Sequence, residues 1–487
     1  MESKKCVEEK GKHGIKNCIC PQVLWLKSFS LYWIFIVMGI ANTILGTSLV
    51  HLEKLMNVGE QTMSTVITFF ALGYLIGSIL CASMYDRLKP EFLFFAFNSV
   101  ACVATIGAGL ISSFPFFVTF VVIKGIGFGF NDSAGQSYGL RIWNKHQCRN
   151  SLIQAIHLCW SFGGIVGPFI IKPFLCEVNH SYENFNKTLN ESEIVFEQDK
   201  ILGNISTTCL DVIELATVRK AFIVVGLIVL SANIPFLIIL LFNISKHKKL
   251  SLVRQKKNDV VIEDVTEEKI FLGKPDVQTN RIEQILHLKL ILLTFVFVFG
   301  LLCYYIEGVT IAFITAFALK HLHWSVYQSS LILSIYFGAH FACRLLGVVV
   351  SAFLKPITIL SITMTVATTA FLLMLAVNAL PSILWVVVML AGFGTGIIYP
   401  TNIIWVSENL LVTGKVSSVI VCGGSVGWIT GPLIVGMLTS HYGQMCLVYF
   451  LVGSSSLFLI LFILEALFIK VFGKKRHTSI IQNNILN

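Results

Sequence analysis

Several ionisable residues lie inside long apolar stretches of this sequence, and four of them are of particular interest. Asp132 and His157 belong to the first half of the chain, and Glu307 and Arg344 belong to the second half. A charge held in hydrocarbon costs several kcal/mol, so residues of this kind usually have a function. With a helical rise of about 1.5 Å per residue, Asp132, His157 and Arg344 would lie in one layer, about 13–16 Å from the basic end of each helix.

Asp132 is the leading candidate for a cation-binding residue. A carboxylate at this depth can bind a cation or a proton, and a hard cation such as sodium prefers oxygen ligands. Asn131 precedes it and Gln136 follows it by one turn, so their amide oxygens could join its shell. The alternative is an ion pair that only joins helices, with Arg344 or Lys124 as the partner. A tethered Lys124 ammonium could also replace the cation, and sodium would then not be needed.

Other polar residues in the apolar stretches are candidates for contact with a small solute. Gln154 lies one turn from His157, and Asn42 and Tyr399 lie in the first and tenth stretches. Amides offer both donors and acceptors, which suits a ligand rich in hydroxyl groups. Glu307 is a candidate for substrate or cation contact. The alternative for His157 is a histidine that only fills space in helix packing.

The composition indicates a membrane protein. Of 487 residues, 55% are hydrophobic and 13% are charged, whereas soluble domains carry about 25% charged residues. The apolar residues form twelve blocks of membrane-spanning length, which must be helices because lipid offers the backbone no hydrogen bonds. These blocks are 29–50, 63–85, 91–112, 114–138, 150–175, 218–242, 288–318, 327–352, 356–378, 380–403, 412–437 and 443–470. Soluble enzymes and nucleic-acid binders are excluded.

The charge distribution predicts the orientation of these helices. Segment 243–287 holds nine Lys and Arg residues, whereas segment 176–217 holds two, against eight Asp and Glu. Basic loops face the cytosol. We therefore expect a cytosolic tail 1–28, an N-terminal six-helix bundle 29–242, a cytosolic linker 243–287, a C-terminal six-helix bundle 288–470 and a cytosolic tail 471–487. The expected location is the plasma membrane.

Segment 176–217 would then face outward. It contains four N-x-S/T sequons, at Asn179, Asn186, Asn190 and Asn204, so we expect glycosylation there. Cys176 and Cys209 lie near its ends and could form a disulfide in an oxidising compartment.

The two halves of the chain repeat a glycine pattern. The repeated motifs are Gly125-x-Gly127-x-Gly129 with Gly392-x-Gly394-x-Gly396, and Gly163-x-x-x-Gly167-Pro168 with Gly427-x-x-x-Gly431-Pro432. Glycines at these spacings let helix backbones approach closely. Tyr399 stands at the repeat position equivalent to Asp132. Two parallel repeats of six helices are the plan of the major facilitator fold.

The segment Tyr85-Asp86-Arg87-Leu88-Lys89 resembles the end of the major facilitator loop signature G-x-x-x-D-R-x-G-R-R, with Ala82 in place of the first glycine. The resemblance implies that Asp86 and Arg87 form a cytosolic charge latch that holds an outward-open state. Arg344 would have a structural or gating role.

A narrower resemblance covers nearly all twelve blocks. Gly125 to Gln136, Gln154 to His157 and Tyr399-Pro400-Thr401 are similar to helices of sodium-dependent glucose transporters and the MFSD4-like branch, and more distantly of fucose–proton symporters. The resemblance implies uptake of glucose or a similar small sugar by alternating access, coupled to sodium or a proton. We expect a monomer in the lipid bilayer.

Two alternatives to this function stay open. One is uncoupled facilitation of another small polar solute, and the other is a membrane receptor or enzyme. The chain has no G-x-x-x-x-G-K-[ST], no H-E-x-x-H and no convincing nucleophile–base arrangement, so we expect neither an ATP-driven pump nor an enzyme. No organic cofactor, metal cofactor or nucleic-acid partner is expected.

Overall fold

The computed structural model describes residues 21–174, 218–242, 275–409 and 413–485. These residues contain helices and turns but no strands, and twelve helical stretches are long and apolar enough to cross a membrane. The prediction of an all-helical membrane protein with twelve spans is confirmed. Long apolar stretches become helices because a helix satisfies its own backbone hydrogen bonds in lipid.

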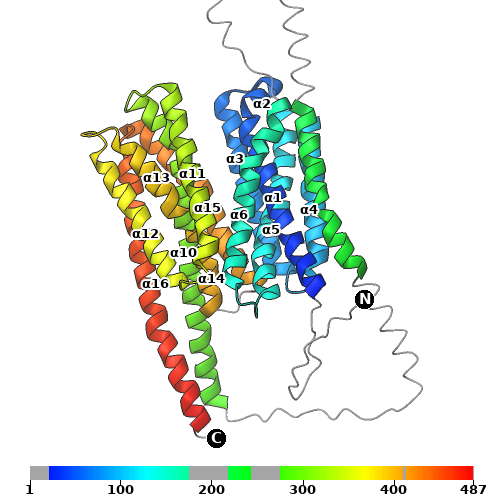
Figure 1. Ribbon diagram of the computed structural model, residues 1–487, viewed down its shortest axis with the longest axis vertical. Helices are drawn as coiled ribbons and strands as arrows, with labels where there is room; N and C mark the ends of the chain where they lie inside the picture. The colour runs from blue at the N-terminus through cyan, green and yellow to red at the C-terminus, as the bar shows by residue number, and fades with distance from the viewer. Residues whose placement is uncertain (1–20, 175–217, 243–274, 410–412, 486–487) are drawn as a thin grey trace, which may run out of the picture.

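The spans form two bundles that stand side by side (Figure 1). The N-terminal half contains α1 (Pro21–Thr47), α3 (Glu60–Met84), α4 (Pro90–Leu110), α5 (Phe114–Ile142), α6 (Arg149–Ile171) and an unlabelled helix, Val218–Phe242; a short α2 (Leu49–Met56) follows α1. The C-terminal half contains α10 (Pro275–Lys320), α11 (Val326–Val350), α12 (Pro356–Leu373), α13 (Ile383–Thr395), α14 (Ile398–Asn409), α15 (Gly414–Tyr442) and α16 (Cys446–Ile485).

The glycines of the repeat lie where helices meet backbone to backbone. A Cβ added at Gly129 would overlap the Tyr74 carbonyl of α3, and one at Gly163 would overlap the Ile36 carbonyl of α1. In the C-terminal half, a Cβ added at Gly392 would overlap a backbone carbonyl of α11, and one at Gly427 would overlap a backbone carbonyl of α10. The first helix of each half thus packs on the fifth, and the second packs on the fourth.

The tenth span is broken, although its sequence predicts one block, 380–403. α13 ends at Thr395, and α14 begins at Ile398. A break in a spanning helix frees backbone groups that other partners must satisfy. Arg344 on α11 does this, because its Nε donates to the Gly396 carbonyl at 2.9 Å.

Two helices continue beyond the lipid-crossing length. α10 begins at Pro275, and its apolar part is Leu290–Lys320; α16 ends at Ile485, and its apolar part is Cys446–Lys470. Both extend below the bundles in Figure 1. The last part of the expected linker 243–287 and most of the tail 471–487 are therefore helical where the structure describes them.

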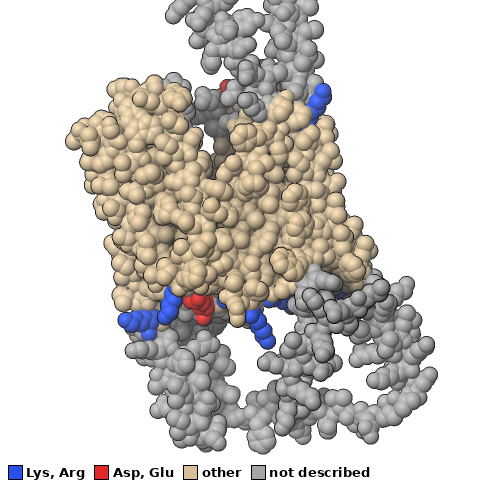
Figure 2. Space-filling view, in the orientation of Figure 1, with Lys and Arg blue, Asp and Glu red and all other residues tan. Residues whose placement is uncertain are grey.

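One end of the molecule is basic, and we call it the basic face. It carries the exposed residues Arg87, Arg141, Lys355 and Lys415, and most of the visible Lys and Arg side chains gather there (Figure 2). The start of α1 and the end of α16 also lie at this end (Figure 1). At the opposite end, a hollow separates the two halves (Figure 2).

Candidate functional site

Asp132 lies in the middle of α5, buried at 7% exposure. Its Oδ1 accepts a hydrogen bond from Gln136 Nε2 at 3.1 Å, and the Tyr74 hydroxyl of α3 also hydrogen-bonds to it. One helical turn separates Asp132 from Gln136, so both side chains share one face of α5. The carboxylate thus has two neutral donors. Among the described residues, neither Lys124 nor Arg344 forms an ion pair with it.

Lys124 is fully buried in α5 and contacts uncharged groups. Its Nζ donates to the Ala41 carbonyl of α1 at 2.7 Å. It also lies 5.7 Å from the ring centroid of Phe70 and 5.6 Å from that of Phe128, which are favourable cation–π distances. This ammonium joins α1 to α5 and does not neutralise Asp132.

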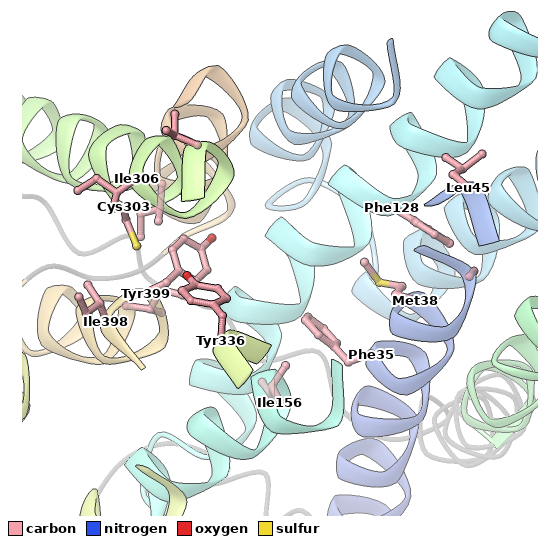
Figure 3. Close-up of a cluster of buried hydrophobic side chains, with 14 of the residues drawn as sticks. Phe35, Met38, Leu45, Phe128, Ile156, Cys303, Ile306, Tyr336, Ile398 and Tyr399 are labelled. Atoms are coloured by element: carbon pink, nitrogen blue, oxygen red, sulfur yellow. The ribbon is translucent and has the colours of Figure 1, made fainter. Parts of the chain in front are cut away.

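Tyr399 connects the carboxylate to the C-terminal half. Gln136 Nε2 donates to its hydroxyl at 2.9 Å, so one amide group touches Asp132 and Tyr399 together. The Tyr399 ring also meets His157 at 5.4 Å and Tyr304 at 4.9 Å, both edge to face. In Figure 3, Tyr336 and Tyr399 lie on the side of the C-terminal half that faces Phe35 and Ile156 of the N-terminal half, and the Tyr336 hydroxyl lies 3.0 Å from the Thr395 hydroxyl of α13. The central polar cluster is defined by Asp132, Gln136, His157 and Tyr399.

Several buried polar atoms around the central polar cluster have no hydrogen-bond partner within the described residues. Gln136 Oε1, Gln154 Oε1 and His157 Nε2 belong to this set, although Gln154 Nε2 donates to Thr401 at 2.8 Å. Both amide atoms of Asn131 are also unpaired. A buried polar atom without a partner costs about 1–3 kcal/mol. The cluster can therefore gain free energy from a ligand with several hydroxyl groups.

Glu307 and Arg344 lie in the C-terminal half. Glu307 Oε1 is 3.6 Å from His340 Nε2, and both residues are buried. Arg344 follows His340 by one turn and reaches across to α6, where it donates to the His157 carbonyl at 3.2 Å and to Ser161. Its guanidinium also lies 5.4 Å from the Trp160 ring. Arg344 thus joins the two halves near the middle of the membrane.

Further hydrogen bonds join the halves toward the basic face. The hydroxyl oxygens of Ser137 on α5 and Ser417 on α15 lie 2.7 Å apart. The Arg149 guanidinium donates to the Ser407 hydroxyl at 2.8 Å. Together with the Gln154–Thr401 bond, they hold this end closed.

The loop after α3 contributes to the same closure. Asp86 accepts a hydrogen bond from the Gly414 backbone N–H at 3.3 Å. Gly414 opens α15, so the carboxylate lies at a positive helix terminus. Burial raises the pKa of the neighbouring Tyr85 hydroxyl. Arg87 is exposed to solvent. This geometry suits a latch formed by Asp86.

The remaining candidates are Asn42 and the residues of segment 176–217. Asn42 is half-buried on α1, and it makes no hydrogen bond to the central polar cluster in the part of the chain that the structure covers. The sequons at Asn179, Asn186, Asn190 and Asn204 and the cysteines Cys176 and Cys209 lie outside the described residues.

Three contacts at the site were not predicted from the sequence. They are Tyr74 on Asp132, Ser161 on Arg344 and the Ser137–Ser417 pair. The contact of Tyr74 could have been predicted, because Tyr74 lies between Gly73 and Gly77 on the helix that packs against α5. Serines in apolar helices commonly bond to their own backbone, so their partners on other helices leave no pattern.

The fold and the central polar cluster define a membrane transporter with two pseudo-equivalent halves. The sequence model of the Major Facilitator Superfamily matches residues 31–432 and 296–483, and the chain belongs to this superfamily. The predicted resemblance is thereby confirmed. Membership of a transporter superfamily also confirms that the chain is not an enzyme.

Individual relatives are distant but cover most of the chain. Human sodium-dependent glucose transporter 1 is 23% identical, over 85% of this chain and 74% of its own length. Human major facilitator superfamily domain-containing protein 4A is 22% identical, over 85% and 86%. The superfamily transporter FucP in its outward conformation superposes with a TM-score of 0.64 at 13% identity, covering 91% of this chain and 98% of FucP. The proton:xylose symporter XylE gives 0.58 at 15% identity, over 92% and 95%.

Proposed function

We propose that the chain is a secondary active transporter that couples a cation, sodium in the first instance, to uptake of glucose or a similar small sugar. The observation that carries this proposal is the Gln136 amide, which hydrogen-bonds to both Asp132 and Tyr399. A carboxylate suited to a cation is thus linked, through one side chain, to the opposite half of the molecule. Coupled transport requires such a link between ion site and moving halves.

The charge of Asp132 explains how a cation would promote transport. A carboxylate without a counter-charge is costly to bury, and its present donors, Tyr74 and Gln136, are neutral. A bound cation would lower the cost of enclosing the site when the hollow closes. The empty site would close less readily, so ion and solute would cross together.

The proposal of a sugar substrate rests on the unpaired polar atoms of the site and on the relatives of the chain. Gln136 Oε1, Gln154 Oε1 and His157 Nε2 can accept or exchange hydrogen bonds with hydroxyl groups. Half-buried Tyr304 lies beside Tyr399 and Trp428, and aromatic rings of this kind stack on sugar faces. One of the relatives is a sodium-dependent glucose transporter, and the similar solved structures include a fucose:proton symporter and a proton:xylose symporter.

The proposed topology has the basic face in the cytosol and the hollow open to the outside. Basic loops stay on the cytosolic side, and the exposed Arg87, Arg141, Lys355 and Lys415 share one face. Both termini would then be cytosolic and segment 176–217 would be extracellular and glycosylated, in a plasma membrane.

The first test is uptake of a labelled glucose analogue by cells that express the chain. Sodium in the medium is either present or replaced by choline. We expect wild-type uptake to require sodium and Asp132→Asn to abolish the sodium-dependent part, because an amide cannot balance a cation. Glu53→Gln on α2, outside the central polar cluster, is the matched control and should retain sodium dependence.

The outcomes separate the two candidate functions. Uptake that ignores both sodium and the Asp132→Asn change would indicate uncoupled facilitation. Absence of uptake from surface-expressed protein, with a panel of hexoses and pentoses, would remove sugar as the substrate and leave the fold unaffected.

A further inference from the structure

We propose that Glu307 and His340 form a second ionic site, which binds a proton and makes transport respond to a pH gradient. This inference rests on the transport activity proposed above. The pair lies in the C-terminal half, on α10 and α11, whereas Asp132 lies in the N-terminal half on α5. The protein would therefore hold one ion-binding group in each half.

The geometry isolates this pair from water. Glu307 is 7% exposed and His340 is 4% exposed, with 3.6 Å between Oε1 and Nε2. The Tyr336 ring stacks on the imidazole at 6.0 Å. In the described residues His340 Nε2 has no hydrogen-bond partner. A small approach of the two side chains would bring a shared proton into a hydrogen bond between them.

Among the described groups that face Glu307 and His340, Arg344 alone carries a permanent charge. Cys303 and Tyr304 on α10 and Tyr336 on α11 interact electrostatically with Glu307, but thiols and phenols are ordinarily neutral at neutral pH. From α13, Thr395 offers only its hydroxyl, which lies 3.0 Å from the Tyr336 hydroxyl. Arg344 interacts with both members of the pair. From α6, His157 faces Arg344.

The ligand chemistry favours a proton over sodium. The site consists of one carboxylate and one imidazole nitrogen, whereas sodium requires several oxygen ligands. With Glu307 ionised and His340 neutral, the pair has a net charge of −1. Uptake of one proton gives either a protonated carboxyl beside neutral imidazole or a carboxylate beside imidazolium, and the net charge becomes zero in both cases. The neutral pair is cheaper to enclose away from water.

Arg344 connects the charge of the pair to the contact between the halves. It lies one turn from His340 and donates to the His157 carbonyl and to Ser161 on α6. A pair with net charge −1 attracts the guanidinium, and a neutral pair does not. Protonation would thereby shift the balance between this attraction and the hydrogen bonds to α6, which is how a bound ion can bias the two transport states.

The transport test uses full-length protein in proteoliposomes with the same sodium concentration on both sides. Uptake of the labelled glucose analogue is measured with an alkaline interior and with equal pH on both sides, and the result is the ratio of the two rates within each variant. We expect a ratio well above one for the wild type, a ratio of one for Glu307→Gln and a changed ratio for His340→Gln, whose carboxyl titrates at a different pH. Glu465→Gln, which also replaces a buried membrane carboxyl, is the matched control and should keep the wild-type ratio. A wild-type ratio of one, or a gradient response that survives in Glu307→Gln, overturns the proposal.

A second measurement needs no transported substrate. Infrared difference spectra of the purified protein, titrated in pH, report the C=O stretch of protonated carboxyl groups. We expect a band that titrates in the wild type and in Glu465→Gln, is lost in Glu307→Gln, and titrates at a different pH in His340→Gln. Identical titrations of wild type and Glu307→Gln contradict proton binding here. Retention of this band in a protein that transports no sugar would refute the proposed function while supporting the proton site.

Discussion

Three buried ionisable residues within the described helices, Lys124, Asp132 and Arg344, make hydrogen bonds only to neutral groups. Lys124 contacts a carbonyl and two phenyl rings, Asp132 contacts an amide and a phenol, and Arg344 contacts carbonyls and a hydroxyl. Opposite charges that neutralised each other would leave no ionic group free to bind anything. The separation of these charges is therefore what makes an ion site plausible in chemical terms.

Replacement of Lys124 tests whether it acts on the cation site. We expect Lys124→Met to keep the sodium dependence of uptake, because the ammonium bonds to Ala41 and not to Asp132. Methionine can fill the space between Phe70 and Phe128. Uptake as a function of sodium concentration is the measurement.

Lys124→Arg is the companion variant, since it keeps the charge while changing the shape. A change in sodium dependence in Lys124→Met that Lys124→Arg does not share would show that the ammonium charge acts on the cation site after all.

The helix and the helix face of each candidate residue could be predicted from the sequence, but its contacts could not. A helix has a regular turn, so the placement of Gln136 and Asp132 on one face followed from their spacing. Lys124 was a candidate ion-pair partner of Asp132, yet its ammonium bonds to the Ala41 carbonyl of another helix. The partner depends on which helix lies opposite, and periodicity in one helix carries no information about that.

At the level of elements, the glycines determine how closely the helices approach. Gly163 lies against the backbone of α1, whereas its neighbour Gly164 has no atom within 4 Å of an added Cβ. The two positions differ in surroundings but share one helix, which makes them a natural pair for comparison.

Alanine at these positions should have opposite effects on stability. Gly163→Ala would force α1 and α6 apart, and we expect a loss of about 1–3 kcal/mol, as for other overpacked sites. Gly164→Ala should be neutral or stabilising by up to about 1 kcal/mol, because alanine favours the helix. Thermal unfolding in detergent measures both. Equal destabilisation by the two variants would argue against the close backbone contact.

The number of spans was predictable because backbone groups in hydrocarbon must hydrogen-bond to each other, which a helix allows. The break between α13 and α14 was not, since 380–403 is a continuous apolar run and Gly396 resembles other helix glycines. At the break, Arg344 from a different part of the chain satisfies the Gly396 carbonyl. A local pattern cannot reveal a partner of this kind.

The whole molecule is closed at the basic face and hollow at the other end. Ser137 and Ser417 lie 2.7 Å apart across the two halves, and both are buried. Alternating access requires this contact to separate during each cycle. A covalent link at this point should therefore stop transport.

The double variant Ser137→Cys/Ser417→Cys tests this motion. We expect an oxidant to abolish most of its uptake and a reductant to restore it, because a disulfide would hold the basic face closed. The two single variants, oxidised in parallel, control for the thirteen native cysteines. Full uptake by a double variant whose cross-link is verified by mass spectrometry would rule out opening at this face.

The contact between Arg344 and Trp160 has an optical consequence. An indole that lies 5.4 Å from a guanidinium has an excited state sensitive to that charge, and the two residues belong to different halves. Separation of the halves would remove the charge and expose the ring to a new environment. The emission wavelength of Trp160 in the unlabelled protein should therefore shift when the transporter changes between its outward-open and inward-open states.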